Sequence, residues 1–195
     1  MKQILVVGKT NVGKTLFTLN FAAYLGMTSV QITFRDIRTS HSKSFSIQEA
    51  IDLFVSDSEH QTKCLQSIIL ALPWGKGTKQ CELIDSTGLV PNIHPDLLIR
   101  QAMGQTLTMV RQIRHMLHII DGTQHAQIDD LDRQLANYGT YVTSYAVIAN
   151  KWDLVQSSHA LQDLKKAFPK QLVIPVSSLH KSGFREVRTY VRNVL

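Results

Sequence analysis

The chain has 195 residues, of which 44% are hydrophobic and 18% charged, so one well-packed core is expected and two domains are not. It contains no stretch of about 18 consecutive apolar residues, and its first apolar run is too short for a secretory signal, so we expect a cytoplasmic protein without a transmembrane segment. The formal net charge of +6 permits an acidic partner such as RNA, a ribosome or a membrane surface, and a solvated basic surface is the alternative.

Strand-like apolar runs alternate with helical patterns along the chain, which is typical of a parallel sheet with crossover helices. Six strands are expected, at residues 3–7, 67–72, 80–84, 116–120, 144–149 and 172–176, and helices at 14–25, 95–114, 128–138, 158–167 and 183–194. The second and third strands are joined by a segment too short for a crossover, so they form an antiparallel hairpin. We therefore predict one α/β domain over residues 1–195, with a mostly parallel six-stranded sheet, one antiparallel edge strand and helices on both faces.

Segment 26–66 interrupts this alternation, because it is polar and rich in serine and threonine. A connection of about forty residues inside a compact domain is usually functional or mobile. Within it, Ser46 and Glu49 have the S-x-x-E spacing of a helix capping box, and the mainly apolar segment AIDLFV follows at residues 50–55. A short helix is therefore predicted to interrupt the loop.

Residues 8–15 read GKTNVGKT and lie between the first expected strand and the first expected helix. In the pattern G-x-x-x-x-G-K-[ST], the glycines Gly8 and Gly13 let the backbone N–H groups surround a phosphate chain. Lys14 would reach the outer phosphates and Thr15 a magnesium ion, while the helix N-terminus adds partial positive charge. The sequence predicts a phosphate-binding loop; a strand-to-helix turn without a ligand is the alternative.

Three further motifs follow in order at the ends of later strands. Asp85-Ser86-Thr87-Gly88 places a carboxylate opposite the phosphate loop, although D-x-x-G alone is common by chance. Asn150-Lys151-Trp152-Asp153 ends the fifth strand, at the sheet edge where open α/β folds bind ligands. The Asp153 carboxylate can accept hydrogen bonds from N1–H and the exocyclic amine of guanine, an arrangement that adenine does not offer. Last, Ser177 and Ser178 follow the sixth strand, where backbone N–H groups can meet the guanine carbonyl.

With these four motifs the chain resembles the small GTP-binding proteins, and among them the Era, EngA and TrmE group of translation-associated GTPases. The resemblance covers nearly the whole chain and implies a three-layer P-loop G domain that binds GTP or GDP with Mg²⁺. The nucleotide-binding positions that it carries over are Gly8, Asn11, Val12, Gly13, Lys14, Thr15, Leu16, Asp85, Gly88, Asn150, Lys151, Asp153, Ser177 and Ser178. Ser178 stands where the group has alanine, which is a mild departure.

The first switch of such a domain needs a threonine that senses the γ-phosphate and joins the magnesium shell. The resemblance favours Thr39, with Thr33 as the alternative, so that the expected magnesium ligands are Thr15, Thr39 and Asp85. The chain between this threonine and the next motif is longer than usual in the group. Segment 26–66 is therefore expected to be an enlarged first switch that carries an extra capped helix for a partner, or a loop that has lost its sensing role.

The expected catalytic positions are Lys14, Thr39, Gly88 and Asn11. Leu89 follows the D-x-x-G motif, so the glutamine that orients the attacking water in Ras-like enzymes is missing, and slow hydrolysis is expected. In several members of the group an asparagine at the position of Asn11 accompanies a bound K⁺ ion, which supplies positive charge near the phosphates. A hydrogen bond that closes the loop is the alternative role for Asn11.

Two classes of function remain open from the sequence. The first is a GTPase switch, whose two loops are ordered by GTP and read by an unidentified protein or ribonucleoprotein partner. The second is a scaffold that holds GTP or GDP in a larger assembly with negligible turnover, an interpretation supported by the unusual first switch and by the expectation that no effector domain follows the last helix. A P-loop kinase is disfavoured by the motif at residues 150–153. The resemblance also allows a nucleotide-dependent homodimer, and Arg185, Arg188 and Arg192 form the best candidate basic patch.

Overall fold

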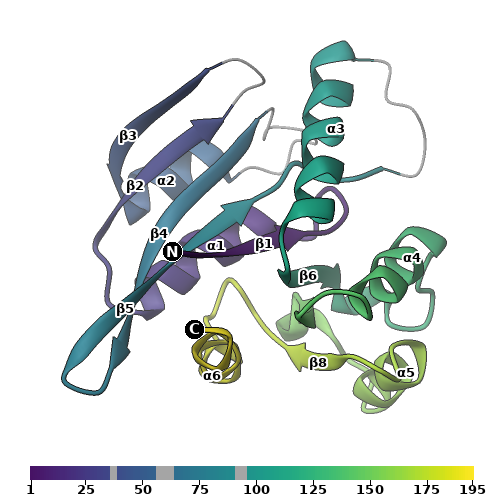
Figure 1. Ribbon diagram of the computed structural model, residues 1–195. Helices are drawn as coiled ribbons and strands as arrows, with labels where there is room; N and C mark the ends of the chain where they lie inside the picture. Colours follow the sequence, from purple (N-terminus) through teal and green to yellow (C-terminus); the bar gives the residue numbers. More distant parts are fainter. Residues whose placement is uncertain (36–38, 56–63, 91–95) are drawn as a thin grey trace.

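The computed structural model describes residues 1–35, 39–55, 64–90 and 96–195 (Figure 1). In these ranges eight strands form one sheet in the order β3-β2-β4-β5-β1-β6-β7-β8. The strands are β1 (Lys2–Val7), β2 (Ser29–Arg35), β3 (Ser40–Ser46), β4 (Leu65–Trp74), β5 (Gly77–Asp85), β6 (His115–Asp121), β7 (Ser144–Asn150) and β8 (Leu172–Pro175). The helices are α1 (Lys14–Tyr24), α2 (Ile47–Phe54), α3 (Leu97–Gln112), α4 (Asp130–Gly139), α5 (Ala160–Ala167) and α6 (Phe184–Val194), with short 3-10 turns η1 (Gly122–Gln124) and η2 (Trp152–Leu154).

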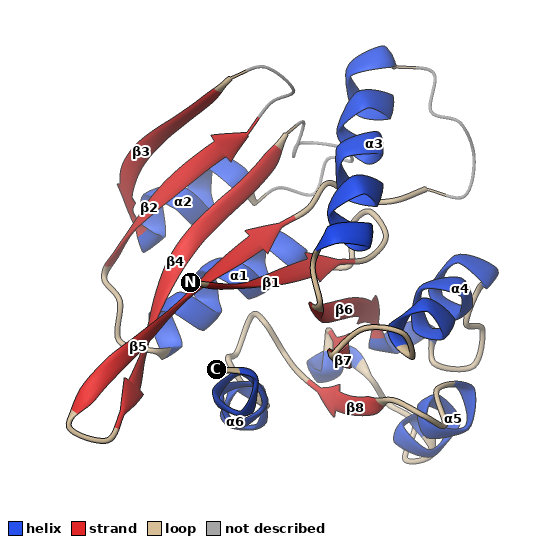
Figure 2. Ribbon diagram, viewed as in Figure 1, coloured by secondary structure: helices blue, strands red, loops and turns tan. Residues whose placement is uncertain are grey.

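The sheet separates the helices into two layers, as Figure 2 shows. The side chains of β1 alternate between the two faces of the sheet: Ile4 and Val6 point to one face, and Leu5 and Val7 point to the other. Both faces are therefore apolar, and each is covered by a layer of helices. The first face packs against α1, α2 and α6, and the second against α3, α4 and α5. The predicted three-layer α/β fold is confirmed. None of the helices in the described ranges is both long and apolar enough to cross a membrane.

The strand count is the main error of the sequence-based prediction, which gave six strands instead of eight. Strands β5, β1, β6, β7 and β8 run parallel, and the hairpin of β4 and β5 is antiparallel as predicted. The antiparallel edge is wider than expected, because β2 pairs with β4 and β3 pairs with β2. The strand predicted at residues 67–72 therefore lies inside the sheet.

Strands β2 and β3 were missed because only one of their faces is buried. In β2, Val30 and Ile32 lie in the core, whereas Ser29 and Gln31 are exposed. In β3, which reads SHSKSFS, Phe45 alone is buried. Such a strand at the edge of a sheet has no continuous apolar run, so its composition resembles that of a loop.

The short helix predicted within this segment is confirmed as α2. The Ser46 hydroxyl accepts a hydrogen bond from the Glu49 N–H at 3.2 Å, and the Glu49 carboxylate accepts one from the Ser46 N–H at 2.8 Å. These reciprocal bonds satisfy two N–H groups that the first helical turn leaves without intrahelical partners. Ala50 and Ile47 then bury one side of α2 against the first face of the sheet.

Candidate nucleotide-binding site

The four sequence motifs meet at one edge of the sheet. The loop at residues 8–15 leaves β1, the segment 85–88 ends β5, Asn150 ends β7, and Ser177 and Ser178 follow β8. These strands are parallel, so their carboxyl ends lie side by side. The fold thus brings together residues that are far apart in the sequence.

The loop at residues 8–15 is shaped by close approach to its neighbours. Gly13 has φ 89° and precedes the first turn of α1. A Cβ atom at this position would lie 2.4 Å from Nδ2 of Asn150, so only glycine fits both the backbone conformation and the space. Asn11 has φ 58° and is exposed, whereas Val12 is buried.

Lys14 is buried beneath this loop, with only 7% of its surface exposed. Its Nζ donates a hydrogen bond to the carbonyl oxygen of Lys9 at 2.7 Å. Burial lowers the pKa of Lys14 to about 8, although the nearby Asp85 carboxylate acts in the opposite direction. A polyanion bound at the loop would stabilise the charged ammonium, so the side chain is suited to a phosphate ligand.

Thr15 and Asp85 form the candidate magnesium centre. The Thr15 hydroxyl donates to Oδ2 of Asp85 at 2.7 Å, whereas Oδ1 of Asp85 is buried and has no hydrogen-bond partner in the described part of the chain. Burial raises the pKa of Asp85 to about 6, against the opposing effects of Lys14 and Thr15. A hydroxyl and a carboxylate are the oxygen donors that Mg²⁺ prefers, and a cation here would offset the cost of the buried charge. The residues therefore fit a magnesium ion.

Gly88 belongs to the chain segment that follows β5 and lies against the phosphate loop. A Cβ atom on Gly88 would be 2.6 Å from the Cα of Thr10, a backbone contact that cannot be relieved by side-chain rotation. The next residue, Leu89, donates its N–H to the carbonyl of Gly8 at 3.1 Å, and its side chain is 2% exposed. Leu89 is thus packed in the core, with its side chain away from solvent.

Asn150 links the phosphate loop to the loop after β8. Its Nδ2 donates to the carbonyl oxygen of Val12 at 2.7 Å. Its Oδ1 accepts from the N–H of Ser178 at 3.0 Å and from the Ser178 hydroxyl at 2.7 Å. The departure from alanine at Ser178 therefore has a structural role, because the extra hydroxyl adds a hydrogen bond to Asn150. Asn20 of α1 also holds this loop, through a bond to the Ser178 carbonyl at 2.9 Å.

The remaining base-motif residues lie on the surface side of this link. Lys151 has φ 57°, and its ammonium lies 2.8 Å from Oδ2 of Asp121 at the end of β6. Asp153 keeps a side-chain exposure of 21% and lies 4.0 Å from the imidazole of His180. The Ser177 hydroxyl accepts from the N–H of His180 at 3.1 Å, so it shapes the loop after β8.

The expected first-switch threonine is placed apart from these motifs. Thr39 is exposed on the connection between β2 and β3, at the same edge of the sheet, and the residues before it, 36–38, are outside the described ranges. Within those ranges it makes no hydrogen bond to the other motifs. The alternative, Thr33, lies within β2 and shares a hydrogen bond of 2.9 Å with the Ser42 hydroxyl.

Sequence reasoning missed several residues that shape the site. Asp121 directly follows the strand predicted at 116–120 and ends the observed β6, and a carboxylate in that position was a usable signal. Thr10, Lys9 and Asn20 gave no comparable signal, because their contacts with Gly88, α4 and Ser178 come from segments distant in the sequence.

A family model described as 50S ribosome-binding GTPase matches residues 3–151 of the chain. The chain belongs to this family. It is a GTP-binding GTPase domain, and the resemblance inferred from the four motifs is confirmed. The match includes the phosphate loop and the segment 85–88 but ends at Lys151, so Asp153 and Ser177 lie beyond it.

Solved structures of related GTPases have the same fold. An Aquifex aeolicus Era variant bound to GDP and AlF4⁻ is 19% identical, with a TM-score of 0.68 over 97% of this chain and 57% of that one. Era in complex with MgGDPNP and a segment of 16S ribosomal RNA is 17% identical, with a TM-score of 0.66 over 97% of this chain and 56% of the other. A GTP-binding protein from Sulfolobus solfataricus in complex with GDP is 18% identical, with a TM-score of 0.55 over 98% and 51%.

The chain therefore spans little more than half the length of these structures. A comparison with curated protein sequences gave no significant match. At these sequence identities the structural similarity shows the fold alone. The reaction has to be inferred from the residues of the site.

Proposed function

We propose that this domain binds GTP and GDP with Mg²⁺, hydrolyses GTP slowly and acts as a nucleotide-dependent switch. The observation that carries the proposal is the Asn150 side chain, which joins the carbonyl of Val12 in the phosphate loop to Ser178 beside the base motif. One amide thereby fixes the spacing between the two ends of a nucleotide site. Pre-organisation of this kind lowers the cost of ordering the loops when the ligand binds.

At the phosphate end, Lys14 and the backbone of residues 8–15 would bind the phosphate oxygens. Thr15 and Asp85 would hold Mg²⁺, with Thr39 as the proposed third ligand when the first switch closes. The metal would neutralise charge that develops on the phosphates during hydrolysis. Oδ1 of Asp85 supports this assignment: it has no hydrogen-bond partner among the described residues, and a buried carboxylate oxygen without a donor is costly unless a cation or water satisfies it.

At the base end, Asp153 would select guanine. Its carboxylate accepts from N1–H and the exocyclic amine, so Asp153→Asn should weaken GTP binding and favour xanthosine triphosphate, whose 2-oxo group accepts a hydrogen bond. Titration of wild type and variant with fluorescent GTP, XTP and ATP measures this directly. Wild-type protein that binds ATP as tightly as GTP would refute the assignment.

Slow hydrolysis follows from Leu89, whose buried side chain has no group that can orient water. We propose that Asn11, exposed on the phosphate loop, helps to bind K⁺ beside the phosphates. Phosphate release should then be slow in sodium buffer and faster in potassium buffer, and Asn11→Ala should abolish the difference while GTP affinity is retained. The control is Asn193→Ala, an exposed asparagine on α6.

The switch itself is tested by limited proteolysis around Thr39. Only the γ-phosphate gives this loop a contact that differs between GTP and GDP, so a GTP analogue should slow cleavage and GDP should not. If neither the cation nor the nucleotide changes rate or cleavage, the alternative function of a GTP- or GDP-binding scaffold gains support.

The partner that reads the switch is also a proposal. An Era structure contains 16S ribosomal RNA, and the net charge of +6 suits a polyanion, so we propose a cytoplasmic ribonucleoprotein or RNA partner. Affinity capture with the domain locked in each nucleotide state would identify it. Size-exclusion chromatography in the same states tests a nucleotide-dependent homodimer.

A further inference from the structure

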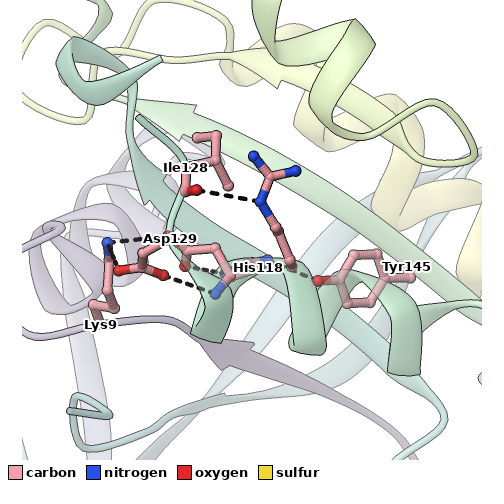
Figure 3. A network of polar contacts seen from close by, with 7 residues as sticks. Lys9, His118, Ile128, Asp129 and Tyr145 are labelled. Atoms are coloured by element: carbon pink, nitrogen blue, oxygen red, sulfur yellow. Dashed lines mark hydrogen bonds and ion pairs between the residues drawn. The ribbon is translucent and has the colours of Figure 1, made fainter. Parts of the chain in front are cut away.

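A chain of polar side chains runs from the phosphate loop into the protein interior (Figure 3). It starts at Lys9, the second residue of the GKTNVGKT loop. The Lys9 ammonium lies 2.6 Å from Oδ2 of Asp129 and 3.0 Å from Oδ2 of Asp132. Both carboxylates belong to the start of α4, where Asp129 is the N-cap residue and accepts a hydrogen bond from the Asp132 N–H at 3.0 Å.

The chain continues through two buried residues of the sheet. Oδ1 of Asp132 lies 3.0 Å from Nε2 of His118 on β6, and Nδ1 of His118 lies 2.7 Å from the Tyr145 hydroxyl on β7. His118 has an exposure of 0% and Asp132 of 2%. In the tautomer with the proton on Nε2, Nε2 donates to Asp132 and Nδ1 accepts from the Tyr145 hydroxyl, so both ring nitrogens have a hydrogen-bond partner.

The charges of this chain favour a fixed ammonium at Lys9. Burial by itself disfavours the charged amine, but hydrogen bonds and charge from Asp129 and Asp132 outweigh it and raise the pKa of Lys9 above its ordinary value. The same contacts lower the pKa of Asp129 although burial acts against this. Lys9 therefore remains cationic throughout the range in which nucleotides are bound, and two carboxylates hold it in place.

The backbone of Lys9 is also a junction of the nucleotide site. The Lys9 carbonyl oxygen accepts the hydrogen bond from Nζ of Lys14. Lys9 also forms an isolated parallel β-bridge with Leu89. Gly8 before it accepts from the Leu89 N–H. A shift of Lys9 would consequently move the entry to the phosphate loop, the resting position of Lys14 and the start of the segment after β5.

We propose that Lys9 is a positioning residue for the nucleotide site. Asp129 and Asp132 hold its ammonium, and His118 and Tyr145 orient Asp132, so that the phosphate loop keeps its binding geometry. Lys9 does not touch the nucleotide in this role. The inference rests on the proposed binding of guanine nucleotides at this loop. An ion pair that merely stabilises α4 against the sheet is the competing explanation.

Lys9→Met separates these explanations, because it keeps the length and apolar stem of the side chain and removes the charge. It should raise the dissociation constant for GDP by about 10- to 100-fold, the equivalent of one lost hydrogen bond to a charged group, mainly through faster release. Lys9→Arg should restore affinity to within about threefold, since guanidinium can reach both carboxylates. The preference for GTP over XTP should be unchanged, because the base motif is not touched.

Two further variants keep the test valid if Lys9→Met folds poorly. The buried Asp132 carboxylate loses its cationic partner in that variant, so the double variant Lys9→Met, Asp132→Asn removes the ammonium and the buried carboxylate together. It should recover thermal stability but not GDP affinity. Tyr145→Phe removes only the hydroxyl that orients His118, and it should weaken GDP by about three- to tenfold.

Gln171→Ala is the matched control, because Gln171 ties the other end of α4 through a 2.9 Å hydrogen bond to the Ala136 carbonyl. It should lower thermal stability without changing GDP release. If Lys9→Met and the double variant release GDP at the wild-type rate, or if Gln171→Ala accelerates release equally, Lys9 has no positioning role. Wild-type protein that fails to bind GDP would instead refute the proposed function, and the inference with it.

Discussion

The carboxyl edge of the parallel strands, where the four motifs meet, is here called the nucleotide edge. It differs from the β2–β3–α2 region in how strictly the neighbouring residues restrict the residue type at each position. At the nucleotide edge, a Cβ on Gly13 would collide with Asn150, and one on Gly88 would collide with the backbone of Thr10. In β3, by contrast, Phe45 is the only buried residue, and the serines around it point to solvent. The nucleotide edge requires particular residues, whereas β3 requires only a strand with one apolar position.

This difference explains where single substitutions should act. At the nucleotide edge the contacts are short, buried and shared by several loops, so one change disturbs the whole site. In β3 all side chains but that of Phe45 are exposed, so the effects of substitutions there should remain local. The following predictions test this contrast, in order of decreasing effect on nucleotide affinity.

Gly13→Ala should have the largest effect. Its φ of 89° is strained for alanine, and the new Cβ would lie 2.4 Å from Asn150, so the substitution should cost about 2–4 kcal/mol of unfolding free energy. GDP affinity should fall by about 100-fold or more, because the loop and Asn150 cannot both keep their positions. Denaturant unfolding and GDP titration measure the two effects.

Gly75→Ala is the control for that experiment. Gly75 also has a positive φ, 58°, but nothing lies within 4 Å of a Cβ placed there. It should cost about 1–2 kcal/mol from backbone strain and leave GDP affinity unchanged. Equal loss of affinity in both variants would show that global destabilisation, and not the contact with Asn150, weakens binding.

Asn150→Ala should have the next largest effect. It leaves the Val12 carbonyl and both donors of Ser178 without their partner in a buried site. We expect a loss of about 3 kcal/mol in unfolding free energy and of about 100-fold in GDP affinity. Asn137→Ala, at an exposed position on α4, should change neither quantity. Unaltered affinity in Asn150→Ala would mean that the two loops are positioned independently.

Asp121→Asn should have a smaller effect, because the ion pair with Lys151 is partly exposed. GDP affinity should fall by about two- to fivefold. Burial tends to raise the pKa of Asp121, but bonds from Lys151 and Thr123 outweigh it and lower the pKa below the ordinary value of 3.8. The stability from this carboxylate is therefore present above pH 3.8 and lost as the pH falls through the folded-state pKa. The stability difference between wild type and variant should shrink at the acid end of a pH series and not at neutral pH.

Ser46→Ala should leave nucleotide affinity unchanged within twofold. It removes the capping hydroxyl of α2 and should cost about 1 kcal/mol of stability. The control is Ser44→Ala, an exposed serine two positions earlier in β3 that should be neutral. A large loss of GDP affinity in Ser46→Ala would show that the β2–β3–α2 region is coupled to the site, contrary to the contrast drawn above.

The same contrast decides how much could be predicted from the sequence. The parallel strands and the four motifs were found because buried strands give continuous apolar runs and tight loops need glycine, lysine or asparagine at fixed spacing. Helix α2 was found through the capping box of Ser46 and Glu49. Strands β2 and β3 were missed because a half-exposed strand leaves only weak alternation. The hydrogen bond from Asn150 to Val12 and the ion pairs of Lys9 with α4 join segments that are distant in the sequence, so no local sequence pattern predicts them.

The pairing of β3 on one side only has a consequence for its amides. In an antiparallel pair, residues alternate between those that bond to the neighbouring strand and those whose N–H points away from it. Among the described strands β3 pairs with β2 alone, so every second amide along Ser40–Ser46 faces outward, whereas β1 has a strand on each side. In hydrogen–deuterium exchange, every second backbone amide of β3 should therefore exchange at the earliest labelling times. The amides of β1 should exchange only when much of the protein unfolds.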